Sequence, residues 1–204
     1  MATATRRTPN RGIIGSQVTR RLTNWVRTAS RCPVSTGHKH FDSAGSHSST
    51  LCTQLLKDPE VRRLLYRYEG VDDGHDLPYL AGYSKDGKTI YIDRHLPETL
   101  SYTHDGRTRD YRVRNFLIDH ESFEKAVIDA LDWKYAHAHQ GATEYERRHV
   151  MQAGLLWTPY QDAYKPYIKA DEHEKLKKVP ADLDLTPYLD DPALLARLKK
   201  AMKH

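Results

Sequence analysis

Residues 115–133 read NFLIDHESFEKAVIDALDW, and this stretch predicts the long helix on which the fold is built. At about 100° of rotation per residue, such a helix has one polar and one apolar side. The polar side carries Ser122, Lys125, Asp129 and Asp132, and the apolar side carries Phe116, Leu117, Phe123, Val127, Ile128 and Leu131. His120 and Glu124 lie in the middle of the apolar side, with Glu121 at its border.

His120 and Glu124 therefore need partners in the interior of the protein. An ionised carboxylate that is buried without a partner costs on the order of several kcal/mol or shifts its pKa. The two residues are four apart in the sequence, so their side chains point the same way from a helix. This helix alone leaves two interpretations open, a buried structural pair or two ligands of one metal ion.

A second helix is predicted over residues 135–153, and it repeats the pattern. His139 and Glu146 are seven residues apart and share one side of this helix, whereas His137 and Glu144 point away from it. The side with His139 also carries Tyr135, Ala142, Thr143, Val150 and Ala153. Small residues there would let another helix approach closely. Gly141 leaves a break possible, which would change the direction of His139.

Antiparallel packing of the two helices would bring His120, Glu124, His139 and Glu146 together. Imidazole and carboxylate groups are ligands of zinc, and a carboxylate-rich set also suits iron or manganese. We expect His120, Glu124 and His139 to be ligands, and Glu146 to be a fourth ligand or a group that orients one. The other interpretation is a structural polar cluster without a metal.

The sequence around these helices predicts a small α+β body over residues 58–179. Asp58-Pro59-Glu60 is typical of a helix start. Residues 78–83 and 89–93 are predicted strands, joined at an Asp86-Gly87 turn into a short hairpin. Residues 101–109 are predicted to be a polar loop. Residues 180–204 are expected to be a linker and a C-terminal helix that begins at Asp191-Pro192.

Residues 1–57 are expected to be a basic, disordered arm. Residues 1–41 contain no Asp or Glu and carry a charge of +8, which exceeds the +5 of the whole chain, so the remainder has a net charge of −3. Such an arm could contact an anionic partner. The alternatives are a targeting segment and an extension without a function.

Several classes of protein are excluded or disfavoured. No apolar run approaches the roughly 18 residues of a membrane-spanning helix, so no membrane span is expected. Two cysteines, Cys32 and Cys52, are too few for a disulfide framework and favour a reducing compartment such as the cytoplasm. The absence of a Gly-rich phosphate loop argues against a nucleotide-dependent enzyme.

The motif His120-Glu121-x-x-Glu124 resembles the active helix of zincin-type metallopeptidases. In that family two ligands lie four residues apart on a helix, the Glu after the first is the general base, and a further ligand often comes from the next helix. The resemblance implies a zincin-like fold, a bound zinc ion, a peptide or protein substrate and Glu121 as the catalytic base. The chain departs from the family at Glu124, where a second His is usual.

The resemblance covers residues 75–155, which are also similar to uncharacterised bacterial and phage-associated proteins. A second hypothesis follows from another class of protein. The chain could be a non-catalytic structural or binding component of a phage or mobile element. Its basic arm would then contact nucleic acid or an acidic partner, and the His/Glu cluster would only stabilise the fold.

Overall fold

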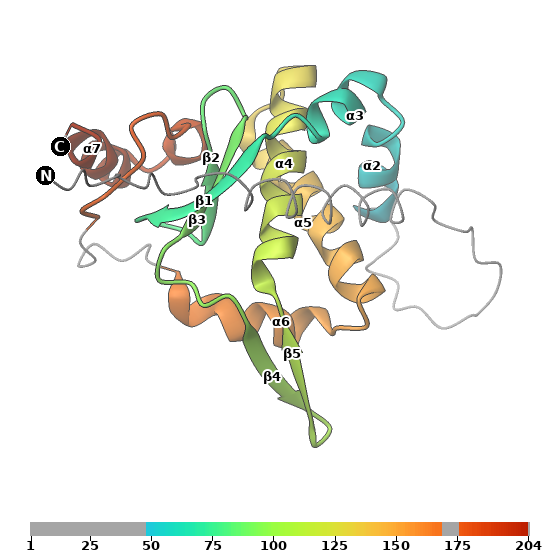
Figure 1. Ribbon diagram of the computed structural model, residues 1–204. Helices are drawn as coiled ribbons and strands as arrows, with labels where there is room; N and C mark the ends of the chain where they lie inside the picture. Colours follow the sequence, from blue (N-terminus) through green and yellow to red (C-terminus); the bar gives the residue numbers. More distant parts are fainter. Residues whose placement is uncertain (1–47, 169–175, 204) are drawn as a thin grey trace, which may run out of the picture. The chain divides into compact units, whose positions relative to one another are not determined.

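The structure, a computed structural model, describes residues 48–168 and 176–203 and has an α+β fold (Figure 1). Its six α-helices are α2 (Ser48–Leu55), α3 (Pro59–Leu65), α4 (Val113–Leu131), α5 (Tyr135–Gln152), α6 (Trp157–Tyr164) and α7 (Pro192–Ala201). Its strands are β1 (Gly70–His75), β2 (Ala81–Tyr83), β3 (Thr89–Asp93), β4 (Leu100–His104) and β5 (Arg107–Tyr111). None of the helices in these ranges is long and apolar enough to span a bilayer.

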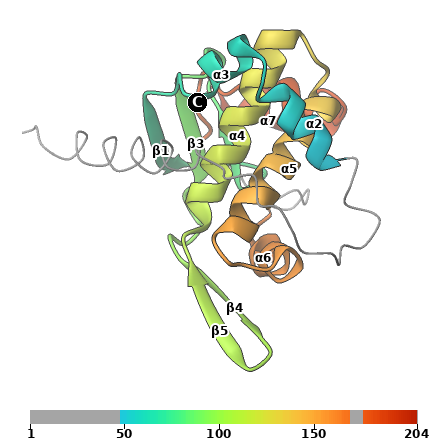
Figure 2. The ribbon, with the colours of Figure 1, turned by 90° about the vertical axis from the view of Figure 1, so that its right-hand side faces the viewer.

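Helices α4 and α5 form a helical hairpin at the centre of the described residues (Figures 1 and 2). The chain leaves α4 at Asp132, whose φ of 51° turns the backbone towards α5. Helix α5 runs unbroken through Gly141. A Cβ atom at Gly141 would lie 3.3 Å from side-chain atoms of both Phe123 and Leu55. Glycine at this position therefore lets α5 approach α4 and α2 closely.

The three-stranded sheet has β3 at its centre, parallel to β1 and antiparallel to β2. The predicted strand over residues 89–93 is confirmed, and the turn before it contains Gly87 with a φ of 68°. Strand β1 was not predicted, because Val71 is its one apolar residue and its two glycines indicated the end of a helix. Helix α4 packs against β2 and β3, which brings the sheet next to the His/Glu residues.

The predicted polar loop over residues 101–109 is wrong, because β4 and β5 form a hairpin there. Asp105 and Gly106 make its turn, with φ values of 50° and 70°. Leu100, Tyr102 and Tyr111 are buried at the base of the hairpin, and the residues between them are mostly exposed and polar. The apolar alternation of a strand is therefore confined to the base, which left no clear pattern in the sequence.

The predicted start of the body at residue 58 is also wrong, because helix α2 belongs to the fold. Cys52 and Leu55 are buried in one apolar cluster with Phe123 and Ala142 of the central helices. Residues 1–47, the rest of the expected arm, lie outside the described residues. The helix start at Asp58 is confirmed, since its carboxylate accepts hydrogen bonds from the backbone N–H groups that open α3.

Residues 176–188, which we call the C-terminal strap, include the linker expected at the start of residues 180–204, and they pack against the sheet. Leu183 and Tyr188 of the strap are buried, and Leu183 pairs with Ser84 just beyond β2. The backbone N–H of Asp184 donates to the Tyr83 carbonyl oxygen at 2.9 Å. The strap therefore covers part of the outer edge of β2. The predicted C-terminal helix is confirmed as α7, with Asp191 as its N-cap.

Asp76 attaches the start of the strap to the sheet. Its Oδ2 accepts hydrogen bonds from the backbone N–H groups of Lys177 and Lys178, both at 2.9 Å, and its Oδ1 accepts one from Arg94 Nε at 2.7 Å. Burial by itself would raise the pKa of the Asp76 carboxyl, but these hydrogen bonds outweigh it and hold the pKa below its ordinary value. The ionised form of Asp76 therefore stabilises the folded chain.

Replacing Asp76 by Asn should lower the free energy of unfolding by about 2 kcal/mol at neutral pH, because the strap loses a charged acceptor. A depressed folded pKa means that the stabilisation is present above the unfolded pKa of about 3.9 and is lost as the pH falls through the folded value. The difference between variant and wild type should therefore shrink on acidification. Urea unfolding at neutral and acidic pH measures this difference in the free energy of unfolding, with Asp190→Asn as an exposed control. A difference that does not depend on pH would contradict this role of Asp76.

Candidate metal centre

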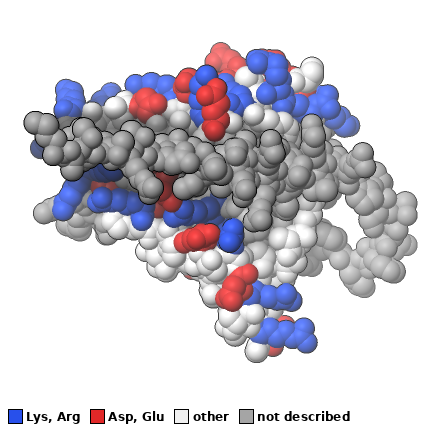
Figure 3. Space-filling view, viewed as in Figure 1, with Lys and Arg blue, Asp and Glu red and all other residues white. Residues whose placement is uncertain are grey.

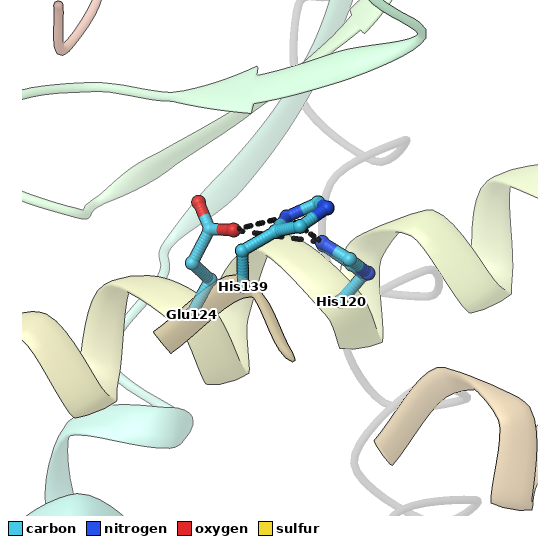
Figure 4. A group of neighbouring side chains, drawn as sticks. All are labelled: His120, Glu124 and His139. Atoms are coloured by element: carbon cyan, nitrogen blue, oxygen red, sulfur yellow. Dashed lines mark hydrogen bonds and ion pairs between the residues drawn. The ribbon is translucent and has the colours of Figure 1, made fainter. Parts of the chain in front are cut away.

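Helices α4 and α5 bring three side chains together at the centre of the fold (Figure 4). His120 and Glu124 stand one turn apart on α4, and His139 approaches from α5. His139 Nδ1 lies 2.8 Å from Glu124 Oε2 and 3.1 Å from His120 Nε2. His120 Nε2 lies 3.6 Å from Glu124 Oε2. Each of these three atoms can offer a lone pair to a metal ion.

The spacing of the three atoms fits a transition-metal ion. Zinc–ligand bonds of about 2.0–2.2 Å in tetrahedral geometry place neighbouring ligand atoms roughly 3.4 Å apart. The three observed distances, from 2.8 to 3.6 Å, lie on both sides of that value. Small rotations of the side chains would therefore suffice to admit an ion. We name this group of His120, Glu124 and His139 the His/Glu centre.

Glu146 contacts the other ring nitrogen of His120. Its Oε2 lies 2.9 Å from His120 Nδ1, while its Oε1 accepts a hydrogen bond from the Tyr160 hydroxyl at 2.6 Å. A carboxylate on Nδ1 keeps the proton there and leaves Nε2 free to bind a metal. Glu146 thus contacts His120 on the ring nitrogen that faces away from Glu124 and His139.

Tyr83 of strand β2 holds Glu124 in a similar way. The Tyr83 hydroxyl donates to Glu124 Oε1 at 2.9 Å, so that Oε2 is the carboxylate oxygen turned towards the two imidazoles. The side chain of Glu124 is only 2% exposed, and that of His120 is 9% exposed. Both candidate ligands on α4, His120 and Glu124, are therefore held by buried hydrogen bonds to residues of other elements.

Two buried carboxylates, those of Glu124 and Glu146, contact the imidazoles of the His/Glu centre. Burial by itself would lower the pKa of His120, but its interactions with the carboxylates of Glu124 and Glu146 outweigh burial and raise the pKa well above its ordinary value. Burial would raise the pKa of Glu124, but hydrogen bonds from His120 and His139 lower it instead. Because Glu124 and Glu146 are buried carboxylates in contact with these imidazoles, a proton or a divalent cation between them is favoured.

Glu121 is close to the centre without being part of it. It is partly buried, and no hydrogen bond from the described residues is found on its side chain. Burial and then the charge of Glu124 raise the pKa of Glu121 to about 8, and the nearby charge of His120 lowers it only in part. A carboxylate in this environment can take up a proton near neutral pH.

The His/Glu centre is closed on the side of α4 and open on the side of α5. The side chain of His139 is 47% exposed, although its Nδ1 faces the two buried ligands. The ring of Tyr135 lies beside that of His139, and the Tyr135 hydroxyl is 3.4 Å from His139 Nδ1. Among the described residues, a small molecule would thus reach the centre past His139 and Tyr135.

A second group, formed by Asp76, Asp93 and His95, is also compact enough to hold a cation. Its carboxylate oxygens are already occupied, however. Both oxygens of Asp76 accept the hydrogen bonds described above, and Asp93 accepts from the backbone N–H groups of Leu77 and His95 at 2.9 and 2.8 Å. These hydrogen bonds show that Asp76 and Asp93 attach loops to the sheet.

Two residues that support the centre were not identified from the sequence. Tyr160 lies in a run of tyrosines at helical spacing, which is more often a sign of packing, and Tyr83 ends a short strand. Hydrogen bonds from Tyr83 and Tyr160 to Glu124 and Glu146 depend on tertiary contacts across 41 and 14 residues. No local pattern in the sequence indicates such contacts.

No family model, curated protein or solved structure matches the chain.

The geometry predicts that the purified protein binds about one transition-metal ion per chain. Replacing His120 or His139 by Ala should abolish this binding, because two remaining ligands hold an ion only weakly. Elemental analysis after dialysis against zinc measures the stoichiometry. His137→Ala is the matched control, since His137 lies on the same helix and is exposed. Full occupancy in both His120→Ala and His139→Ala would contradict the assignment.

Proposed function

We propose that this chain is a metal-dependent hydrolase and that the bond it cleaves is a peptide bond. The observation that supports the proposal is the convergence of three ligand atoms from two helices, with the half-exposed side chain of His139 on one side. Structural zinc sites close with four protein ligands, whereas catalytic sites keep a position open for water or substrate. Zinc is the proposed metal, with iron or manganese as alternatives.

The likeness to zincin-type metallopeptidases supports the same proposal. The His120-Glu121-x-x-Glu124 motif lies on a helix that packs against a sheet, and His139 comes from the following helix. A carboxylate as the second ligand is compatible with zinc. We therefore propose a zincin-like centre with His120, Glu124 and His139 as ligands.

The residues around the centre can each be given a role. When bound, the metal would supply a Lewis acid that polarises the substrate carbonyl and lowers the pKa of a coordinated water. Glu121 would accept the proton of the attacking water and return it to the leaving amine. Glu146 would hold His120 with Nε2 towards the centre, and Tyr83 would hold Glu124 Oε2 towards it.

A second candidate function is that of a non-catalytic structural or binding protein. The observation that favours it is that the hydrogen bonds of Glu124 and Glu146 join β2, α4, α5 and α6 into one buried network. Such a network can serve folding alone. The basic arm that would contact nucleic acid or an acidic partner falls within residues 1–57, of which residues 1–47 lie outside the described part of the chain.

Glu121→Gln separates the two functions. The amide keeps the size of the side chain but cannot accept the proton, so hydrolysis of a fluorogenic peptide pool should fall by roughly 10²–10⁴-fold. Metal content and melting temperature should stay unchanged, because Glu121 is not one of the three ligands. Glu144→Gln, on α5 away from the centre, is the matched control and should keep full activity.

Two results would contradict the proposed mechanism. One is a peptidase activity that Glu121→Gln retains in full, since Glu121 would then not be the base. The other is a loss of metal from Glu121→Gln as complete as that from His120→Ala, since Glu121 would then be a ligand. A protein that binds metal and cleaves no peptide in the pool would favour the structural function.

A further inference from the structure

The β4–β5 hairpin extends away from the rest of the described residues (Figures 1 and 2). Its two strands pair with each other and with no other strand among the described residues, so both outer edges keep unpaired backbone groups. Unpaired strand edges are sites at which an extended peptide can add by backbone hydrogen bonds. Another chain could therefore bind along either free edge of the hairpin.

One face of the hairpin borders a hollow, which we call the hairpin pocket. It is lined by Tyr102, His104, Asp105, Arg107 and Arg109 from the hairpin and by Gly154 and Leu156 from the α5–α6 connection. Tyr102 pairs with Arg109 and His104 pairs with Arg107, so the strand register places these four side chains on one face of the hairpin. The opposite face carries Ser101, which donates to Asp110, and the Thr103–Thr108 pair, so its polar groups are satisfied.

Arg107 and Arg109 are exposed and have no ion-pair or hydrogen-bond partner within the described residues. Most other arginines of the body are paired, for example Arg94 with Asp76 and Arg114 with Asp73. Figure 3 shows Lys and Arg side chains, with Asp or Glu side chains beside them, standing out from the lower part of the molecule, where Figure 1 places the hairpin. Two guanidinium groups at one hollow form a site for carboxylates, which they can bind with paired hydrogen bonds.

The floor of the pocket is apolar and fixed. Leu156 is 44% exposed, and its backbone N–H donates to the Tyr102 hydroxyl at 2.8 Å, which ties the α5–α6 connection to the hairpin. A Cβ atom added to Gly154 would meet nothing within 4 Å, so the space beside it is open. An apolar side chain could therefore lie against Leu156 while neighbouring carboxylates reach the arginines.

We propose that the hairpin pocket binds an extended acidic segment of a protein partner, in which carboxylate and apolar side chains alternate. The carboxylates would pair with Arg107 and Arg109, and the apolar side chains would cover Leu156. The segment would add to a free edge of the hairpin through its backbone, since alternate residues of a strand point to the same face. This interaction does not depend on the metal centre or on hydrolysis.

The charge of the hairpin favours a peptide over a nucleic acid. Nucleic-acid interfaces neutralise many phosphates with clusters of Lys and Arg. The pocket offers two arginines and is also lined by Asp105, whose carboxylate oxygen Oδ2 lies 3.3 Å from His104 Nε2. A few carboxylates beside apolar side chains match this composition better than a run of phosphates does.

An array of short peptides that alternate Glu or Asp with Leu, Val or Tyr tests the proposal, beside a second array in which Lys replaces the acidic residues. The acidic array should retain the purified protein, and the Lys array should not. The tightest acidic peptide, labelled with fluorescein, then gives dissociation constants by anisotropy. Arg107→Gln/Arg109→Gln should weaken its binding about tenfold, because each partly exposed pair contributes up to about fivefold.

Arg62→Gln/Lys200→Gln is the matched control, since it removes the same charge from exposed positions on α3 and α7 and should leave the affinity unchanged. Melting temperatures of both double variants should equal that of the wild type. The proposal is overturned if the acidic array retains no more protein than the Lys array, or if the control weakens binding as much as the hairpin variant. It is also overturned if a labelled oligothymidylate binds more tightly than the peptides and this binding requires Arg107 and Arg109.

Discussion

The burial of Glu124 and Glu146 between α4 and α5 is the constraint on which the rest of the structure depends. Both carboxylates are almost inaccessible to water, so each must find hydrogen-bond donors inside the protein. The donors come from four directions, namely the Tyr83 hydroxyl on β2, the Tyr160 hydroxyl on α6 and the imidazoles of His120 and His139. These hydrogen bonds hold the sheet and the helices together around the two buried carboxylates.

The contacts that hold the fold together also position the residues of the His/Glu centre. Tyr160 packs edge-on against Phe116 of α4, and its carbonyl oxygen accepts a hydrogen bond from the Tyr111 hydroxyl at 3.2 Å, so the base of the hairpin also supports Glu146. Gly141 allows α5 to approach α4 closely enough for His139 to reach Glu124. A centre held in this way offers its ligand atoms in place, and its negative charge favours a cation. Binding of a metal would therefore require little reorganisation.

The sequence was sufficient for the parts of the site that follow helical periodicity. His120 and Glu124 fall on an apolar helix side, and the phase of α5 favours His139 over His137, so their convergence could be predicted. The support of Tyr83 and Tyr160 could not, because it arises where distant segments meet. Helix α2 and the β4–β5 hairpin were missed for a related reason, since their few buried residues are spaced among polar ones. The strap was missed because its contacts with the sheet, Leu183 with Ser84 and Lys177 with Asp76, join residues about 100 positions apart.

X-ray absorption at the zinc edge, recorded on protein loaded with one equivalent of zinc, tests most directly whether the His/Glu centre is a metal site. We predict nitrogen and oxygen ligands at about 2.0–2.2 Å from the zinc, with the more distant scattering that is typical of two imidazole rings. In His139→Ala that imidazole scattering should fall by half or the bound zinc should be lost. A wild-type spectrum without imidazole scattering, or one that is unchanged in His139→Ala, would contradict the assignment of His120, Glu124 and His139 as ligands.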